Sequence, residues 1–579
     1  MADKTYDAVI VGGGNKALLL AMYLIKYGGM SVGIFERRHE IGGCLATEEI
    51  AAPGFRGNTH ATIIVPFYYA PLYRDFPEFW EYGAQSDQYL VADGASFSNN
   101  GTCLTIYSEK HDPAQEKTAR EIARFSGRDA DNWLKLWDLY KSDEMQSVQM
   151  DALFNPAEAR LAPEVQERQM ALYPRLVKAG FEPDSLMMAA SYLRAGRELF
   201  ESDELLYCIM RLILTGRDIN DTGVGAEMFT MGASLPTLGF ARGGTHQIAH
   251  AAHQILVQSG CEFFTHAEVE KVVIENGTCT GVRLTDGSQV GARKLVVSTL
   301  NPAQLCFNLI GREHIGDHRM ARRVDALESE FLCLMWYSYA LHEAPRYEAA
   351  AFNPDINQTF WLGLADDADP EHIARECHYQ KLHKFPPLQD YCPAIWCHSL
   401  VDPAYAPPGM HIAQSEQLGP PAPTYSPSEW QEVKRRYLDN LLTVWQKHAP
   451  NMTRDNLIGV HYNTPYDAKR MSNLGPNGNM AVIDCSPYQR DANRPIPELA
   501  NHRTPVKNLY ATGSAWHVGG FASSSEAYNC YKIIASDLDL GKPWEEPGKQ
   551  EPDSLVEETR AVSRRIRESF KAGSAGGAA

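Results

Sequence analysis

Hydrophobic positions at the start of the chain are grouped in a pattern that predicts two kinds of element. The apolar run Tyr6–Val11 contains β-branched residues and predicts a buried strand. Three glycines follow, and then Leu18–Tyr27, which is rich in Leu and other helix formers, predicts a helix. A second apolar run, Met30–Phe35, ends at the acidic Glu36. This order of elements predicts a βαβ unit of about thirty residues.

The turn between this strand and helix has the features of a phosphate site. A helix N-terminus leaves backbone N–H groups unpaired and carries partial positive charge, and Gly12 and Gly14 let the backbone approach a pyrophosphate closely. Ala17 stands at the third position of the G-x-G-x-x-G/A pattern, and Glu36 is placed to accept hydrogen bonds from a ribose. The unit predicts dinucleotide binding, but it does not by itself separate NAD from FAD.

Two features after Glu36 bear on the cofactor and on the substrate. The Gly42-Gly43 pair lets a loop pass close to the second half of a dinucleotide, which favours a flavin. An aromatic cluster, Phe67–Tyr69 with Tyr73 close behind, packs into a core or lines an apolar substrate pocket.

Charge and composition narrow the function classes. The 579 residues carry a net charge of −18, which disfavours binding to nucleic-acid backbones and non-specific attraction to anionic membranes. No apolar run reaches the roughly 18 residues of a membrane-spanning helix, and no signal peptide fits before the first strand. The twelve cysteines are scattered and form no metal-ligand set, so we expect reduced thiols, no metal site and a cytoplasmic protein.

Taken together, the motifs of the chain resemble those of the FAD-dependent phytoene desaturase-related oxidoreductases, within the flavin amine oxidase superfamily. The resemblance covers nearly the full length. It rests on five stretches: Val11–Ala17 with Glu36, Gly42-Gly43, Gly243-Gly244 to Val269, Asp402–Gly409, and Asn508–Phe521.

The resemblance implies that FAD is the cofactor and gives a role to each motif residue. These are, in chain order, Gly12, Gly14 and Asn15 at the pyrophosphate, Glu36 at the adenosine ribose, Gly43 and Cys44 near the ribityl and phosphate region, Val269 at the adenine, Gly513 on the pyrophosphate side, and Gly520, Phe521 and Ala522 at the pyrimidine edge of the flavin. The last position also has a physical reason, because reduced flavin gathers negative charge at this edge and the positive end of a helix stabilises it.

The fold expected from the resemblance and from the changes in periodicity is α/β, with a Rossmann-like FAD-binding domain, a sheet-based substrate domain and a helical insertion. Its expected segments are residues 1–110, 236–300 and 501–545 for the FAD-binding domain, 111–235 for the helical substrate or cap insertion, 301–500 for the substrate-binding domain, and 546–579 for a C-terminal helix with a disordered tail from Gly573.

The chain departs from the family pattern near its last motif. Relatives often carry His-Pro-Gly-Gly, where this chain has His517-Val518-Gly519-Gly520. The next residues, Ala522–Glu526, are more polar than the usual Gly-Ala run. Because this helix is expected to begin beside the flavin, the departure favours a substrate that is less purely hydrocarbon than a carotene.

The function implied is an FAD-dependent oxidoreductase that dehydrogenates a largely apolar, alicyclic or isoprenoid-like small molecule by hydride transfer to flavin N5. Desaturation also needs a proton acceptor, and the candidates for a catalytic role are His517, His60 and Tyr528, with Glu526 nearby. His517 is the preferred candidate because it lies inside a cofactor motif.

Three other functions stay open: flavin-dependent isomerisation with no net redox change, amine oxidation, and FAD binding without catalysis. The electron acceptor (oxygen or a quinone), a peripheral membrane contact and a homo-oligomer also stay open.

Overall fold

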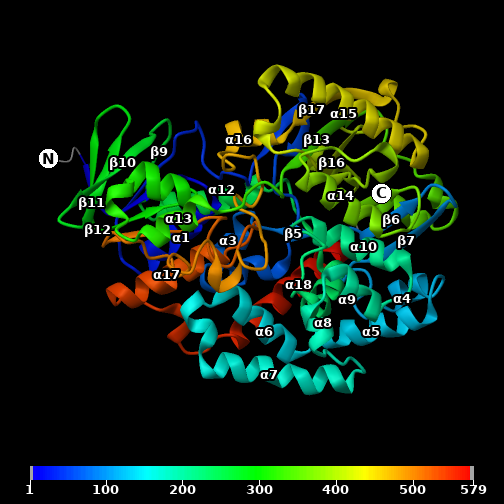
Figure 1. Cartoon of the computed structure of the whole chain (residues 1–579), viewed down its shortest axis with the longest axis horizontal. Coiled ribbons are helices and arrows are strands. Elements are labelled where there is room, and N and C mark those ends of the chain that lie inside the picture. The colour runs from blue at the N-terminus through cyan, green and yellow to red at the C-terminus, as the bar shows by residue number, and fades with distance from the viewer. Residues whose placement is uncertain (1–3, 574–579) are drawn as a thin grey trace.

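The computed structural model of the chain describes residues 4–573 and contains two seven-stranded sheets. Figure 1 shows the sheet with the N-terminal strand on the left, the second sheet on the right beneath the long yellow helix α15 (Pro427–His448), and a group of helices below. The architecture is the predicted α/β fold, in which a Rossmann-like domain adjoins a sheet-based domain with helices packed on it.

The first sheet is built from segments that are far apart in the chain. Its strands are, in spatial order, β10 (Val269–Glu275), β11 (Thr278–Leu284), β12 (Gln289–Ser298), β1 (Lys4–Val11), β2 (Val32–Phe35) and β9 (Glu262–Phe264), with β18 (Leu509–Ala511) paired to β12. β1 runs parallel to both β12 and β2, and Val11 lies opposite Ser298 on one side and Phe35 on the other. The carboxyl ends of these strands therefore meet at one edge, where parallel sheets bind their ligands.

The predicted strand–helix–strand unit is present as β1, α1 (Asn15–Lys26) and β2. α1 begins three residues before the apolar stretch that predicts it, because Gly14 already occupies the N-cap position in an extended conformation. The helix is buried along most of its length against α12 (His246–Gln258) and α17 (Ser525–Leu538). These three helices cover the same part of the first sheet.

The second sheet combines strands from both sides of the helical segment. Its strands are, in spatial order, β17 (Leu457–Asn463), β13 (Leu334–Leu341), β16 (His411–Leu418), β15 (Ala394–Trp396), β14 (Thr359–Ala365), β6 (Val91–Phe97) and β7 (Thr102–Tyr107). β6 and β7 join this sheet because Val91 pairs in parallel with Thr359 of β14. Segment 1–110, which we assigned to the FAD-binding domain, therefore contributes strands to both sheets.

Helix α15 covers one face of the second sheet. It starts with a capping box, in which Ser426 and Glu429 satisfy each other's backbone N–H groups. Its apolar side packs on β13, with the Tyr437 ring centroid 5.0 Å from that of Tyr337 and the Trp445 ring 5.4 Å from that of Tyr339. This face of the sheet is thus closed to solvent by aromatic packing.

The stretch between β7 and β8 (Phe240–Ala241) is helical and packs against β6 and β7. Its helices are α4 (Glu116–Ile122), α5 (Gly127–Tyr140), α6 (Asp143–Phe154), α7 (Pro163–Lys178), α8 (Ser185–Ala189), α9 (Tyr192–Leu199), α10 (Asp203–Leu214) and α11 (Met228–Ser234). The most buried of them is α10, whose residues from Leu205 to Leu214 are all buried. It forms a shared core with β6 and β7 of the second sheet.

The remaining short elements connect these layers. They are β3 (Thr47–Ala52) paired with β4 (Phe55–Asn58), β5 (Ser86–Asp87) paired with β8, and the helices α2 (Ala70–Asp75), α3 (Glu78–Glu81), α13 (His318–Asp325), α14 (Glu371–Lys381) and α16 (Pro465–Ser472).

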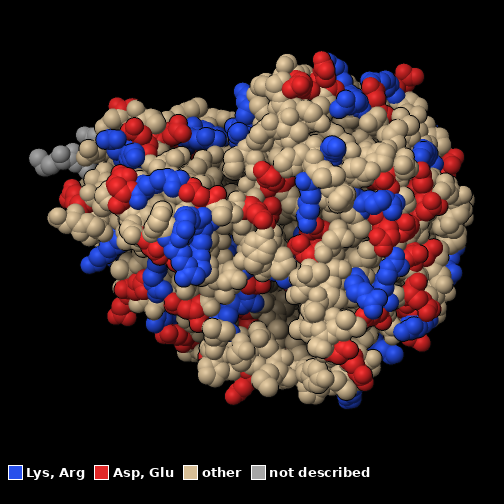
Figure 2. Space-filling model, in the orientation of Figure 1, with Lys and Arg blue, Asp and Glu red and all other residues tan. Residues whose placement is uncertain are grey.

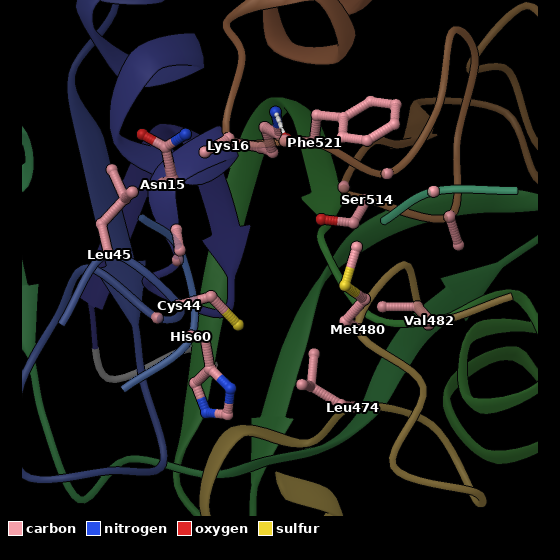
Figure 3. A pocket seen from close by; sticks show the side chains of 18 of the residues that line it. Asn15, Lys16, Cys44, Leu45, His60, Leu474, Met480, Val482, Ser514 and Phe521 are labelled. Atoms are coloured by element: carbon pink, nitrogen blue, oxygen red, sulfur yellow. Dashed lines mark hydrogen bonds between the residues drawn. The ribbon is translucent and has the colours of Figure 1, made fainter. Parts of the chain in front are cut away.

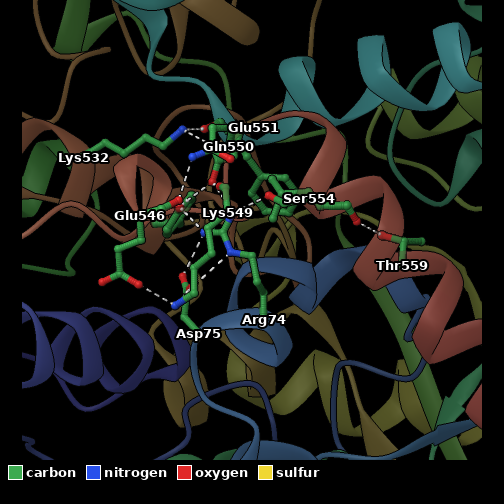
Figure 4. Close-up of polar contacts among 12 residues, drawn as sticks. Arg74, Asp75, Lys532, Glu546, Lys549, Gln550, Glu551, Ser554 and Thr559 are labelled. Carbon is green, nitrogen blue, oxygen red and sulfur yellow. Dashed lines mark hydrogen bonds and ion pairs between the residues drawn. The ribbon is translucent and has the colours of Figure 1, made fainter.

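The C-terminal helix α18 (Asp553–Gly573) is held against the first domain by a buried group of charges just before it. Glu551 accepts hydrogen bonds from Arg74 at 3.0 Å and from Tyr528 at 2.5 Å, and pairs with Lys532 at 2.5 Å (Figure 4). The expected helix after residue 546 is therefore docked on the protein. The expected disordered tail begins at Gly573, where α18 ends, and otherwise lies outside the described residues.

Charged side chains of both signs are interspersed over the face in Figure 2. Within residues 4–573, no helix combines the length and the apolar character that are needed to cross a membrane.

Candidate active site

A cavity of about 640 Å³ is lined by residues of both sheets and of the helical segment. Figure 3 looks into it, with Cys44 and His60 on one side and Leu474, Met480 and Val482 on the other. At one end it reaches the glycine turn after β1, and at the other the inner face of the second sheet. We describe these as the dinucleotide end and the sheet end.

At the dinucleotide end, α1 begins as a phosphate site requires. The helix has no side-chain cap and no acidic residue in its first turn, so its N-terminal partial charge is not neutralised from within the helix. A Cβ added at Gly14 would meet no protein atom within 4 Å, and Gly14 has an ordinary φ of −71°. The absence of a side chain here thus leaves open the space next to the helix N-terminus.

Glu36 lies at the end of β2, on the rim of the same cavity. One of its carboxylate oxygens accepts a hydrogen bond from the backbone N–H of Gly13 at 2.7 Å, and the other from that of Arg38 at 2.8 Å. These bonds fix the carboxylate beside the glycine turn, where a ribose would bring its hydroxyl groups.

The residues of this end fit FAD. The uncapped N-terminus of α1 leaves backbone N–H groups as donors, and the oxygens of a pyrophosphate accept hydrogen bonds. The space that a Cβ at Gly14 would fill lies beside these donors, so it marks a place for the pyrophosphate.

All eleven residues predicted to hold the cofactor line this cavity. Besides those already described, they are Gly12, Asn15, Gly43, Cys44, Val269, Gly513, Gly520, Phe521 and Ala522. Burial raises the pKa of the Cys44 thiol to about 11, so it is uncharged at neutral pH. The particular role of each residue stays a prediction.

Lys16 is a cavity residue that our sequence analysis missed. It follows Asn15 in the glycine motif, yet its ammonium group is buried and lies 2.6 Å from Glu526 at the start of α17. It also donates to the backbone oxygen of Phe521 at 2.9 Å (Figure 3). Lys16 therefore ties the N-terminus of α1 to the segment expected at the flavin.

Of the three candidates for a catalytic role, His60 alone lines the cavity. Its Nε2 lies 2.6 Å from the hydroxyl of Ser472. Burial, with a smaller contribution from Arg38, lowers the pKa of His60 to about 3, so its imidazole is neutral near pH 7.

His517 and Tyr528 lie elsewhere. The ring nitrogens of His517 face the backbone oxygens of Asp491 at 2.6 Å and Asn155 at 3.0 Å, and the residue is fully buried outside the cavity lining. The Tyr528 hydroxyl belongs to the charged group near α18. Both residues lie near the cofactor motif in sequence, but their side chains form hydrogen bonds with other parts of the protein and do not face the cavity.

The sheet end of the cavity is mostly aromatic. Trp336 of β13 and Trp361 of β14 line it, and the buried Trp396 of β15 lies between them, with ring centroids 5.0 Å from Trp336 and 4.8 Å from Trp361. Phe67 and Tyr68 also line the cavity, whereas Tyr69 and Tyr73 are core residues, so the aromatic cluster divides between the two roles that its sequence left open. Such a wall suits an apolar ligand.

Comparisons with known proteins point to oxidoreductases. The NAD(P)-binding Rossmann-like domain family matches residues 10–79. The chain is 26% identical over 566 residues to a limonene dehydrogenase subunit of Castellaniella defragrans, covering 94% of this chain and 97% of that protein. It is 25% identical over 280 residues to the neurosporene-forming phytoene desaturase of Cereibacter sphaeroides, covering 48% of this chain and 50% of the desaturase.

Solved structures share the fold over almost the whole chain. Putrescine oxidase bound to putrescine is similar with a TM-score of 0.56 at 13% identity, covering 92% of this chain and 99% of the oxidase. Cyclohexylamine oxidase from Brevibacterium oxydans gives a TM-score of 0.51 at 14% identity, with the same coverage. With the dinucleotide cradle described above, these similarities indicate an FAD-dependent oxidoreductase that resembles a limonene dehydrogenase subunit and a phytoene desaturase in sequence.

Proposed function

We propose that the protein dehydrogenates a largely apolar, alicyclic or isoprenoid-like small molecule. The observation that carries the proposal is that one cavity joins the dinucleotide cradle at Gly14 to the aromatic wall at Trp336 and Trp361. An apolar substrate held on that wall shares an enclosed space with the cofactor, and bound FAD would supply the hydride acceptor at its N5 atom. The similarity to the limonene dehydrogenase of Castellaniella defragrans supports a substrate of the size of a monocyclic terpene.

The protein groups have two tasks in this reaction. The aromatic wall holds the substrate by its apolar surface and excludes water. A base must also take the proton from the carbon next to the one that loses hydride, so that the electron pair left behind forms the new double bond. Of the three predicted catalytic residues, His60 is best placed for this proton, because it alone lines the cavity.

The test starts from the purified holoprotein. Its visible spectrum and the chromophore released on denaturation are expected to be those of FAD. The oxidised protein is then mixed under anaerobic conditions with alicyclic and isoprenoid compounds, starting with limonene. Bleaching of the flavin bands with formation of a dehydrogenated product is the expected result.

The same mixture separates the other functions. Product without bleaching indicates isomerisation, bleaching by amines alone indicates amine oxidation, and an inert flavin across the series contradicts an enzymatic role. With a substrate in hand, His60→Gln is expected to slow the bleaching by about 100-fold or more if His60 is the base. His517→Asn, outside the cavity lining, is the matched control and is expected to leave the rate within a few-fold.

A further inference from the structure

The second sheet contributes Trp336, Trp361 and Glu416 to the cavity lining within the described part of the chain. Glu416 is the exception in this aromatic wall, because it carries a carboxyl group. On β16 it lies in register with Trp336 of β13 on one side and with Ala394 of β15 on the other. It is 3% exposed, so it takes part in the wall of a buried cavity and not in the protein surface.

Behind this wall lie two more buried charged side chains, Arg211 of α10 and Glu376 of α14, neither of which lines the cavity. Arg211 donates from Nη2 to the backbone oxygen of Glu416 at 3.1 Å, and the same atom is 3.8 Å from the Oε1 atom of that residue. Glu376 accepts a hydrogen bond from the backbone N–H of Leu418 at 3.0 Å. Arg211 therefore balances charge at Glu416 without satisfying its carboxyl by a hydrogen bond.

Two polar atoms of the wall have no hydrogen-bond partner among the described residues. One is the Oε1 atom of Glu416, and the other is the indole Nε1 of Trp361. Both side chains line the cavity. Trp361 is on the same face of the sheet as Glu416, since Gly363, two residues farther along β14, is in register with Ala394 and so with Glu416.

Buried polar groups are normally hydrogen-bonded, and leaving one unsatisfied is costly. A pure hydrocarbon bound on this wall would keep both atoms unpaired and dry. A ligand that carries oxygen would satisfy them, because a carboxyl group can bond a hydroxyl or a carbonyl and an indole N–H donates to oxygen.

We propose that Glu416, assisted by the N–H of Trp361, forms a polar subsite that binds an oxygen atom of the substrate, so that the substrate is an oxygenated alicyclic or isoprenoid-like compound such as an alcohol. This rests on the proposed function and narrows its substrate class.

The charges around Glu416 favour a neutral oxygen over an ammonium group. Arg211 already supplies a positive charge 3.8 Å from the carboxyl, and the indole N–H cannot accept a hydrogen bond from a cation. Burial, with Glu376 adding to it and Arg211 opposing it, sets the pKa of Glu416 at about 7. Near neutral pH the carboxyl is thus available both as an acceptor from a hydroxyl and, when protonated, as a donor to a carbonyl.

The experiment compares ligands that share one apolar body. Limonene, perillyl alcohol and perillylamine differ in a single substituent, and their binding is measured by isothermal titration calorimetry under anaerobic conditions with the flavin of the holoprotein reduced by dithionite, so that it cannot accept a hydride. We expect the alcohol to bind about 10- to 100-fold more tightly than limonene, as one hydrogen bond to a buried carboxyl group implies. Equal affinities, failure of the alcohol to bind, or preference for the amine would overturn the proposal.

Three variants test which side chains cause the preference for the alcohol. Glu416→Leu is expected to remove most of the preference for the alcohol while limonene binding is kept. Trp361→Phe, which preserves the stack on Trp396, is expected to remove part of the preference for the alcohol. If Glu416→Leu does not fold, this variant tests the polar subsite in its place. Glu376→Gln, in the same buried cluster but outside the lining, is the matched control and should keep the preference.

Two results from these variants would contradict the assignment. One is a preference that survives in both Glu416→Leu and Trp361→Phe, and the other is a preference lost in Trp361→Phe alone. Because binding is measured without catalysis, failure here is distinguishable from failure of the proposed function, which would show as a flavin that no compound in the series bleaches.

Discussion

Lys16 and Glu526 form a buried ion pair, with Nζ 2.6 Å from Oε2, that joins the first helix of the protein to α17. Neither side chain is more than 6% exposed. The second carboxylate oxygen of Glu526 has no hydrogen-bond partner among the described residues, so Lys16 is its principal compensation for burial. Burial in turn lowers the pKa of Lys16, against the opposing effect of Glu526.

Lys16→Met is therefore expected to destabilise the protein by about 3–5 kcal/mol, because it leaves the buried carboxylate of Glu526 without its counter-charge. Chemical denaturation followed by circular dichroism measures the loss. The double variant Lys16→Met with Glu526→Gln should recover most of it. Lys4→Met provides a control, since the Lys4–Glu262 pair is 46% exposed at both side chains and its loss should cost far less than that of the buried pair. A similar cost in both single variants would refute the special role of the buried pair.

Gly14→Val is expected to abolish FAD binding without unfolding the protein. The added side chain would enter space that holds no protein atom, and the φ of Gly14 suits an L-residue, so the apoprotein has no reason to lose stability. The same space is the one we assign to the pyrophosphate. FAD content, read from the visible spectrum, should fall at least 10-fold while the melting temperature of the apoprotein changes little. Gly127→Val, also at an open position at the start of a helix, should retain full FAD content.

Two buried carboxyl groups, Glu416 in the wall and Glu376 behind it, predict a particular dependence of stability on pH. Burial raises the pKa of both Glu376 and Glu416 from 4.5 to about 7, with Arg211 opposing the shift. The folded protein thus holds these protons more tightly than the unfolded chain, so their contribution to stability is complete below about pH 4.5 and is lost as the pH rises to about 7.

Glu416→Gln removes one titrating group. Between pH 5 and pH 7, the free energy of unfolding of this variant should therefore fall less than that of the wild type, and the two falls should differ by about 1–3 kcal/mol. Urea denaturation at both pH values measures the difference. Parallel pH profiles for the two proteins would show that Glu416 does not titrate in this range.

The charged group around Glu551 predicts how α18 is held. Glu551→Gln leaves Arg74 and Lys532 buried without their shared counter-charge, so α18 should open locally before the rest of the protein unfolds. Hydrogen–deuterium exchange is expected to speed up in Asp553–Gly573 and to stay unchanged in α1. Asp143→Asn, which removes an exposed partner of α18 at Arg560, should have little effect on either helix.

The dinucleotide end could be predicted from the sequence because its signals are local. Gly12, Gly14 and Glu36 are close in sequence, and backbone geometry alone brings them to one edge of the sheet. The second sheet is different. Val91 pairs with Thr359 and Glu416 with Trp336, and nothing near these residues in the chain indicates their partners. Residues 414–417 on the strand of Glu416 are four consecutive polar residues, which does not predict a buried strand, yet all four are buried and Glu416 lines the cavity.

His517 and His60 show a second limit of prediction from the sequence. His517 lies inside a cofactor motif, but the direction of its side chain depends on Asp491 and Asn155, which are contributed by distant segments. His60 stands in an ordinary loop and nevertheless reaches the cavity. Position along the chain indicates which backbone comes near the cofactor, whereas the packing of the whole protein decides which side chain faces it.

The first sheet has a consequence for how the protein is made. Its central strand β1 (Lys4–Val11) is synthesised well before β18 (Leu509–Ala511), which extends the same sheet, and before Glu526, which neutralises Lys16. A nascent chain that lacks them has Lys16 without its ion-pair partner, and its dinucleotide-binding sheet lacks β18. Cofactor capture is therefore expected only after β18 and Glu526 have been made, and chains cut short before β18 are expected not to keep FAD.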